Sequence, residues 1–564
     1  MRKLLVFLAF VCLVGAGAES CSSPATKNER FFGLHCDFHA SPADTTSIGS
    51  TLSEDDIREI CHILQPDFIQ VDCKGHPGWA SYPSAMGNSM PRIQGDPLRK
   101  WRDVTKSEGV DLYVHYSGVY DCRYAGLHPD DAVKKEDGSP ESWYLRTNGN
   151  YADSLLIPQL LELAGKYGLD GIWVDGENWA AALDYDPRTL KAFQEETGID
   201  LDGSLPVKGT PSYDAFRDYC RELFRRYLRH YTAAVHERYP DFRICSNWAF
   251  SDHMPEAPSA PVDFLSGDIF TSLEYARYAV RAIEKQGLPW DLMTWGFRKE
   301  GKVKFYKEPL EMMQEAAEVI SFGGGFSVYF VQLRDGSPDM PKIRNIATLA
   351  KFVHQRKAWT FGGHPVKEVA VLLSTHEHYL ESTGLFLRNG TESAQDAVDV
   401  LCKAGISTVI ASEHDLTDGK ASDYKVIVVP PLKHELPEAT MDILNKFEDD
   451  GGILIWCKAE EMPELAQTVA SLYEPSVRME TASGPVEIVN LVKDGITMVQ
   501  LINAGRYDTP VCDIQVSIRC EKRPSSVYLQ PEGEKLQFEW RDNRAYITVP
   551  SLDIHSVLVI EPTA

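Results

Sequence analysis

The sequence lacks long apolar runs, an excess of positive charge and any regular cysteine spacing. Beyond its first residues, no segment approaches the roughly 20 consecutive apolar residues that a membrane-spanning helix needs. Lys and Arg total 57 against 82 Asp and Glu, which gives a net charge of -25. Nucleic acid and anionic membranes are therefore disfavoured as partners, because phosphate binding relies on clustered cations. A neutral small substrate fits this composition better.

The cysteines also show little organisation. There are 12 in 564 residues, and those beyond Cys12 form no CxxC pair, which is the spacing typical of metal or redox sites. Disulfides are compatible with an exported protein, but a chain of this size does not require them. We expect mostly free, buried thiols and neither a metal nor a cofactor.

The amino terminus has the pattern of a secretory signal peptide. A basic start is followed by an apolar stretch over residues 4–14 and an Ala-Gly-Ala sequence that ends at Ala18, which is typical of a cleavage site. We expect residues 1–18 to be removed and the protein to be secreted or periplasmic.

Residues 29–365 alternate short apolar runs with helical patterns, which is typical of repeated βα units. The predicted strands are residues 31–39, 68–74, 112–117, 171–175, 243–247, 264–268, 292–295 and 326–332. Eight such units in succession predict a closed (β/α)8 TIM barrel. The clearest helix, residues 213–239, carries apolar and aromatic side chains at helical spacing.

The pattern then changes twice. Residues 366–480 contain four further apolar strands separated by helical stretches, which predicts a small, doubly wound α/β domain that resembles the amidotransferase or flavodoxin type. Cys457 follows one of these strands but lacks the glycines of a strained nucleophile turn, so this domain is interpreted as a structural or oligomer-forming module. Residues 481–564 alternate apolar and polar side chains without convincing helices, which predicts a β-sandwich.

The most informative segment is residues 168–179, with the sequence GLDGIWVDGENW. An apolar strand is followed at once by Asp175 and Glu177, and the C-terminal ends of barrel strands point into the active site. Turn or helix capping is the alternative explanation for both acids.

Other predicted strands also end in polar or aromatic groups. Because side chains on a strand alternate between its faces, several of these groups share one face. The candidates for substrate binding are His35, Asp37, His39, Lys74, His76, His115, Tyr116, Trp179, Asn247, Trp248 and Trp295. Asp268 ends the sixth strand and is a further catalytic candidate, although it lies close enough to Ser272 to cap the next helix instead.

Acids, imidazoles, an amide and indoles without a nucleophilic Ser or Cys motif suit glycoside hydrolysis. That reaction needs one carboxylate as nucleophile or base, a second carboxyl group as acid, and side chains that hold a sugar ring. Asp175 is the preferred nucleophile. Glu177 and Asp268 remain alternatives for the acid, and the expected substrate is the terminal sugar of an oligosaccharide or polysaccharide.

The fourth predicted strand resembles the segment that carries the catalytic Asp in the α-L-fucosidase family. His35, His76 and the run His115-Tyr116-Ser117 are similar to that family's polar strand ends. The resemblance implies a retaining mechanism with Asp175 as nucleophile and these histidines as ligands of substrate hydroxyls. The order of domains resembles β-galactosidases with a trimerisation domain, which implies a homo-oligomer through the second domain, but no carboxylate follows Trp295 where their nucleophile lies.

Two other classes of function stay open. The sequence His35-x-Asp37-x-His39 offers ligands that zinc prefers, so a metal-dependent barrel hydrolase is one alternative, although Asn247 and Asp268 stand where such enzymes need histidines. A catalytically silent, carbohydrate-binding barrel is the other.

Overall fold

The computed structural model describes residues 29–269, 272–388 and 392–563. The predicted signal peptide, residues 1–18, lies outside these described residues. Among the helices that are described, none combines the length and the apolar character required to cross a membrane.

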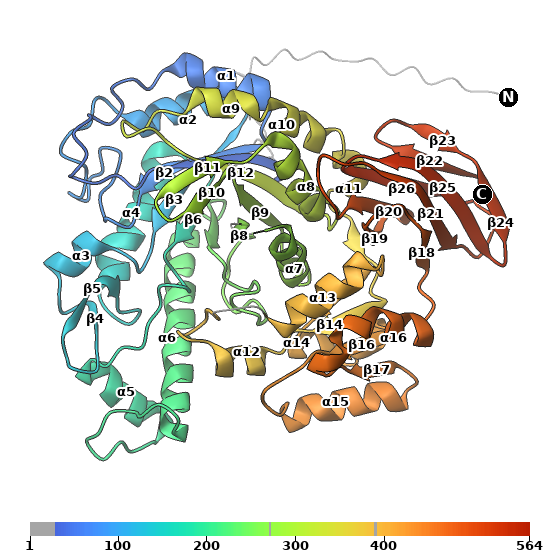
Figure 1. Ribbon diagram of the computed structural model, residues 1–564. Helices are drawn as coiled ribbons and strands as arrows, with labels where there is room; N and C mark the ends of the chain where they lie inside the picture. Colours follow the sequence, from blue (N-terminus) through green and yellow to red (C-terminus); the bar gives the residue numbers. More distant parts are fainter. Residues whose placement is uncertain (1–28, 270–271, 389–391, 564) are drawn as a thin grey trace, which may run out of the picture.

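Eight parallel strands form the predicted barrel, shown in Figure 1. They are β1 (Phe32–Asp37), β2 (Phe68–Lys74), β3 (Asp111–Ser117), β6 (Gly171–Asp175), β7 (Arg243–Ser246), β8 (Leu265–Ile269), β9 (Trp290–Trp295) and β12 (Gly325–Val331). Their order in the sheet is β7-β6-β3-β2-β1-β12-β9-β8. Each strand follows its sequence neighbour around the sheet, so the (β/α)8 prediction is confirmed.

The edge strands β7 and β8 close the barrel without a regular ladder. Two backbone hydrogen bonds join their ends, from Asp263 N to Ile244 O at 2.9 Å and from Trp248 N to Ser266 O at 3.0 Å. These bonds bring the C-terminal ends of β7 and β8 together, which places Asn247 beside Asp268.

Helices surround the barrel. They are α1 (Glu54–Leu64), α2 (Pro97–Ser107), α3 (Cys122–Leu127), α4 (Ile157–Glu162), α5 (Pro187–Thr197), α6 (Pro211–His236), α7 (Leu273–Glu284), α8 (Pro309–Ile320), α9 (Met340–Asn345), α10 (Ala347–His354) and α11 (Lys357–Thr360). Helix α4 is flanked by π-helical turns at Ala152–Leu156 and Leu163–Tyr167. The predicted helix at 213–239 is confirmed as α6.

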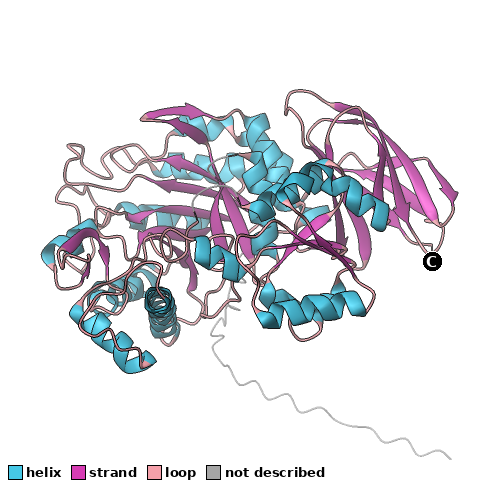
Figure 2. Ribbon diagram, turned by 60° about the horizontal axis from the view of Figure 1, so that its bottom comes forward, coloured by secondary structure: helices cyan, strands magenta, loops and turns pink. Residues whose placement is uncertain are grey.

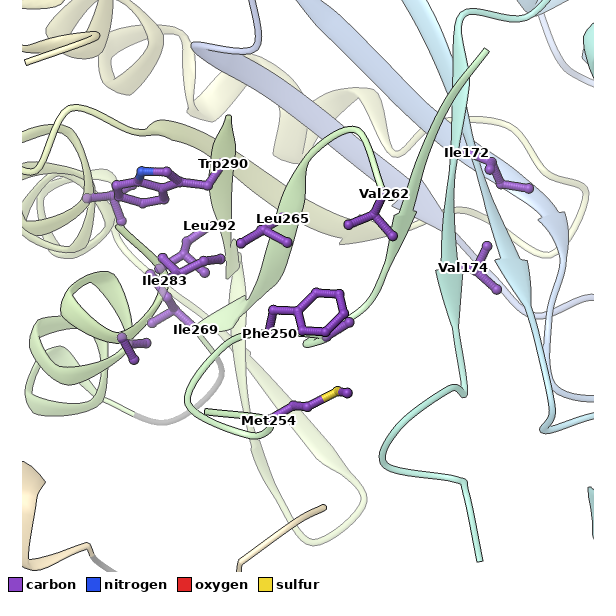
Figure 3. Packing of buried hydrophobic residues seen from close by; sticks show 14 of the residues in the cluster. Ile172, Val174, Phe250, Met254, Val262, Leu265, Ile269, Ile283, Trp290 and Leu292 are labelled. Atoms are coloured by element: carbon purple, nitrogen blue, oxygen red, sulfur yellow. The ribbon is translucent and has the colours of Figure 1, made fainter. Parts of the chain in front are cut away.

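Alternation along β6 decides which way Asp175 points. Ile172 and Val174 belong to the outer core between strands and helices, seen in Figure 3. Trp173 belongs to a separate cluster inside the barrel with Tyr113, Met293 and Tyr329. Asp175 is two residues beyond Trp173 and therefore shares its inward face.

Two short hairpins extend from the barrel and were not predicted from the sequence. One consists of β4 (Ala132–Lys134) and β5 (Pro140–Leu145), after α3. The other consists of β10 (Phe297–Glu300) and β11 (Val303–Tyr306), directly after β9. Both lie between the C-terminal end of a barrel strand and a later helix, and two residues of the second hairpin line the pocket described below.

The second domain is a parallel sheet, as predicted. Its strands are β14 (Val369–Leu372), β15 (Thr408–Ala411), β16 (Val426–Val429) and β17 (Ile453–Trp456), in the order β15-β14-β16-β17. Its helices are α12 (Thr375–Glu381), α13 (Ser393–Lys403), α14 (Glu413–Leu416), α15 (Glu438–Asp449) and α16 (Leu465–Leu472), with 3-10 turns at Lys420–Asp423 and Ala459–Glu464.

The last part of the chain is a sandwich of two antiparallel sheets, which Figure 2 shows as a region of strands without helices. One sheet has the order β13-β19-β20-β26-β22-β23 and the other β18-β21-β25-β24. The strands are β13 (His364–Pro365), β18 (Val477–Thr481), β19 (Val486–Lys493), β20 (Ile496–Asn503), β21 (Val511–Arg519), β22 (Ser526–Gln530), β23 (Glu534–Leu536), β24 (Phe538–Arg541), β25 (Arg544–Leu552) and β26 (His555–Glu561). The expected domain boundaries stay a prediction.

The cysteines of the described residues are unpaired and mostly buried, as expected. Cys457 is among the buried ones, and burial raises the pKa of its thiol. A thiolate is therefore disfavoured there, which agrees with an unreactive thiol.

Candidate active site

A pocket of about 460 Å³ opens at the C-terminal end of the barrel strands. Its lining includes nine of the predicted site residues, contributed by six of the eight strands or the loops that follow them. They are Asp37, His39, His76, Asp175, Trp179, Asn247, Trp248, Asp268 and Trp295. The convergence of polar strand ends is therefore present in the structure.

Asp175 is surrounded by hydrogen-bond donors. Its Oδ1 accepts from Trp179 Nε1 at 2.9 Å and from Asn247 Nδ2 at 3.0 Å. Its Oδ2 lies 3.3 Å from His115 Nε2 and 3.4 Å from His76 Nε2. Burial opposes ionisation, but these neighbours outweigh it and hold the pKa of Asp175 well below its usual range. Asp175 is an ionised carboxylate rather than a helix cap.

Asp268 lies beside Asp175, but its surroundings favour the protonated form instead of the ionised one. Its Oδ2 accepts from Asn247 Nδ2 at 3.2 Å and its Oδ1 from Trp295 Nε1 at 3.2 Å. Burial and the negative charge of Asp175 raise the pKa of Asp268 to about 7. Ser272, not Asp268, caps α7 by accepting a bond from Tyr275 N. The side chain of Asp268 is therefore free to face the pocket.

Asn247 joins the two acids. One nitrogen, Nδ2, donates to Asp175 Oδ1 at 3.0 Å and to Asp268 Oδ2 at 3.2 Å. Both acceptor oxygens therefore lie within 3.2 Å of a single nitrogen, which keeps the two carboxyl groups close together. Gly267, next to Asp268, leaves room for the indole of Trp248, because a Cβ at that position would come within 2.5 Å of it.

The histidines differ in charge although they share neighbours. Burial disfavours a charged His115, but Asp37, Asp175 and Asp72 outweigh it and raise its pKa to about 9. Burial lowers the pKa of His76 to about 3 despite the adjacent Asp175. Near neutral pH an imidazolium at His115 therefore lies beneath the pocket, and a neutral imidazole at His76 lines it.

His35 and His115 form the layer directly beneath the pocket. His35 Nε2 lies 2.9 Å from Asp37 Oδ2, and its Nδ1 contacts the Gln70 side chain. Asp37 also accepts from the Tyr329 hydroxyl at 3.0 Å. These contacts hold the carboxylate of Asp37 in position. His35 therefore positions Asp37 and does not itself line the pocket.

Three predicted site residues are not brought to the pocket. Lys74 is fully buried and pairs with Asp121 at 2.7 Å, where its Nζ also donates to Ser117 O at 2.6 Å. Tyr116 is buried and donates to Gln159 Oε1 at 2.8 Å. Both side chains lie on the outward face of their strands.

Glu177 is the third. It is fully buried and accepts from the Tyr227 and Tyr231 hydroxyls of α6 at 3.1 and 3.2 Å. Gly176 adopts a φ of 59° and turns the chain after β6, so Glu177 packs against Gly118 outside the barrel. Burial raises its pKa to about 8. Of the two alternatives for the acid, the structure places only Asp268 beside Asp175.

The lining also contains cations that the sequence analysis did not predict. Lys299 and Lys304 come from the β10–β11 hairpin, and Arg334 follows β12. The sequence signal for the hairpin is Gly301-Lys302 between two short alternating runs, which is a common two-residue turn pattern.

One group in this pocket has the composition of a metal site. Asp37, His39 and His115 each offer one ligand atom, and these atoms lie within 4.8 Å of one another. His35 is not part of this group, so the set differs from the predicted His35, Asp37 and His39. A metal requires neutral imidazoles, whereas the raised pKa of His115 favours its protonated form.

Comparisons with known proteins agree with this fold. No model of a protein family matches the chain, and a search of curated proteins finds no match. An α-L-fucosidase isoenzyme 2 from Paenibacillus thiaminolyticus is similar in structure, with a TM-score of 0.78, 17% identity, and coverage of 95% of this chain and 100% of that one. A β-galactosidase from Bacillus circulans sp. alkalophilus has a TM-score of 0.66 and 12% identity over 95% and 100% of the two chains.

A GH42 β-galactosidase from G. stearothermophilus is similar too, with a TM-score of 0.68, 12% identity, and coverage of 95% of this chain and 99% of that one. The chain therefore has the three-part fold of these glycoside hydrolases. The resemblance expected from the sequence is confirmed at the level of the fold.

Proposed function

We propose that this protein is a glycoside hydrolase that removes a terminal sugar from an oligosaccharide or polysaccharide through Asp175 and Asp268. The observation that carries this proposal is the pair of carboxyl groups bridged by Asn247, one ionised and one with a pKa of about 7. Glycoside hydrolysis needs such a division between a nucleophile or base and an acid.

The geometry supports a retaining mechanism. Retaining enzymes place their carboxyl groups about 5–5.5 Å apart, and inverting enzymes leave about 6.5–9.5 Å for a water molecule. The Asn247 amide nitrogen lies within 3.2 Å of one oxygen of each acid, which fits the shorter separation of the first class. Asp175 then attacks the anomeric carbon, and Asp268 protonates the leaving oxygen and later activates water.

The proposed sugar is α-L-fucose, because the fold is similar to that of the α-L-fucosidase with the TM-score of 0.78 and the histidines at the strand ends resemble the sequence pattern of that family. His76 and His39 line the pocket and would bind sugar hydroxyls, while Trp179 and Trp248 would cover the ring. Export through residues 1–18 and oligomer formation through the second domain belong to the same proposal. Cell fractionation and light scattering test these last two points.

The test of activity is a screen of aryl glycosides that starts with α-L-fucoside and β-D-galactoside. Proton NMR of the first anomer released distinguishes retention from inversion. Asp175→Asn should lower kcat at least about a thousandfold with an unchanged fold. An unchanged rate in this variant would remove Asp175 from the mechanism, and binding without hydrolysis by the natural protein would favour the silent barrel.

A further inference from the structure

The β10–β11 hairpin carries two lysines that face each other beside the pocket. In the antiparallel register Lys299 is directly opposite Lys304, and both line the pocket. Like charges in directly opposed positions destabilise a strand pair. The next pairs in the register, Arg298 with Phe305 and Glu300 with Val303, contain no second pair of cations.

Neighbouring cations have carboxylate partners. Arg334 pairs with Asp44, Arg298 with Glu311, and Lys342 with Asp339. Lys299 and Lys304 instead lie over aromatic rings, those of Trp295 at 4.7 Å and Phe297 at 4.6 Å. Within the part of the chain that the structure describes, neither lysine forms an ion pair with a carboxylate.

Repulsion within this group is visible in its electrostatics. Burial and the nearby Lys299 lower the pKa of Lys304, and Lys342 and Arg334 act in the same direction. Asp37 is the acid that opposes this shift, but its oxygens already contact His35 and the Tyr329 hydroxyl. The repulsion shows that several cations gather beside the pocket, although the whole chain has a net charge of -25.

We infer that Lys299 and Lys304 bind an anionic substituent of the substrate, namely a sulfate ester or a carboxylate on the sugar or on its neighbour. This inference rests on the proposed function and narrows its substrate class to acidic glycans. It departs from the neutral substrate expected from overall charge, because two lysines that have no carboxylate partner among the described residues line the pocket. Two ammonium groups on one hairpin can bind an oxyanion between them.

Direct binding of inorganic sulfate tests the site without any need for hydrolysis. Lys299 lies over Trp295, so tryptophan fluorescence reports occupancy, and chloride keeps the ionic strength constant. The variants are Lys299→Gln, Lys304→Gln and both together, with Lys302→Gln in the turn of the same hairpin as the matched control. Each single change should weaken sulfate binding about threefold and the double change about tenfold. These factors correspond to the modest contribution that a partly exposed ion pair makes to affinity.

Hydrolysis of sulfated, uronate-containing and neutral aryl glycosides provides the second measurement. The natural protein should prefer one of the anionic series, which identifies the substituent. The double variant should lose that preference, measured as the ratio of kcat/KM on the anionic series to kcat/KM on the neutral series. Sulfate binding without hydrolysis of any glycoside would support the lysine site and count against the proposed function. Hydrolysis of neutral glycosides without a sulfate response, or an equal loss in Lys302→Gln, would overturn the lysine site alone.

Discussion

The protonation of Asp268 should set the alkaline limit of activity, and Trp295 should control where that limit falls. The pKa of Asp268 is raised to about 7 by burial and by Asp175, while the bond from Trp295 Nε1 acts in the opposite direction. An N–H donor stabilises the ionised carboxylate. Replacement by Trp295→Phe removes this donor, so the pKa of Asp268 should rise further and the alkaline limb should move to higher pH.

The expected size of this shift follows from the bond itself. Hydrogen bonds to charged groups contribute about 1.5–3 kcal/mol, and at 3.2 Å this one is long, which favours the lower end. Since 1.36 kcal/mol corresponds to one pKa unit, the limb should move by about one unit. The acid limb belongs to Asp175, whose pKa lies well below its usual range, so it should remain outside the neutral region in both proteins.

The assay is kcat/KM against pH with an aryl glycoside, because that ratio reports the ionisations of the free enzyme. Trp456→Phe, in an exposed position of the second domain, is the matched control and should leave the profile unchanged. A limb that stays in place or moves to lower pH in Trp295→Phe would refute Asp268 as the acid.

Three further predictions concern residues around the pocket. Glu177→Gln should keep activity within about tenfold. The pKa of Glu177 is about 8 in the folded protein and 4.5 ordinarily. The stability contributed by its protonated form is therefore fully present below pH 4.5 and is lost as the pH rises through 8. Glutamine does not titrate, so the melting temperature of the variant should fall less than that of the natural protein across this window. Lys74→Met should lower the free energy of unfolding by about 3–5 kcal/mol, since it leaves Asp121 buried and unpaired; denaturant titration measures this loss. The same variant should not raise KM, which steady-state kinetics would measure. Chelation should leave activity intact, and a loss that zinc restores would instead assign Asp37, His39 and His115 to a metal site.

The barrel strands could be predicted from the sequence within a few residues. Each is a short, mainly apolar run between turn residues, and burial on both faces makes such a run easy to recognise. The two added hairpins were missed because their strands have exposed side chains and only three to six residues. The unpredicted lysines of the pocket come from one of these hairpins.

The direction of side chains at strand ends was harder to predict than the strands. The pairing of β2 with β3 shifts register between Asp72 and Lys74, so the alternation that predicted Lys74 beside Asp72 fails there. Gly176 similarly turns the chain immediately after β6. Alternation predicts the direction of side chains only inside a regular strand. Lys74 and Glu177 lie where that regularity ends, so the direction of their side chains could not be predicted from the sequence.

The same geometry explains why two chemically identical acids differ in protonation. His115 lies 3.3 Å from Asp175 and 4.0 Å from Asp37, and its raised pKa supplies a positive charge on that side of the pocket. Asp268 accepts its bonds only from the neutral donors Asn247 and Trp295 among the contacts described for it. One imidazolium therefore stabilises the ionised Asp175, and the charge of Asp175 in turn holds the proton on Asp268. Environments that separate two pKa values in this way assign the acid and the nucleophile, and here the assignment depends on a histidine beneath the pocket that need not touch the sugar.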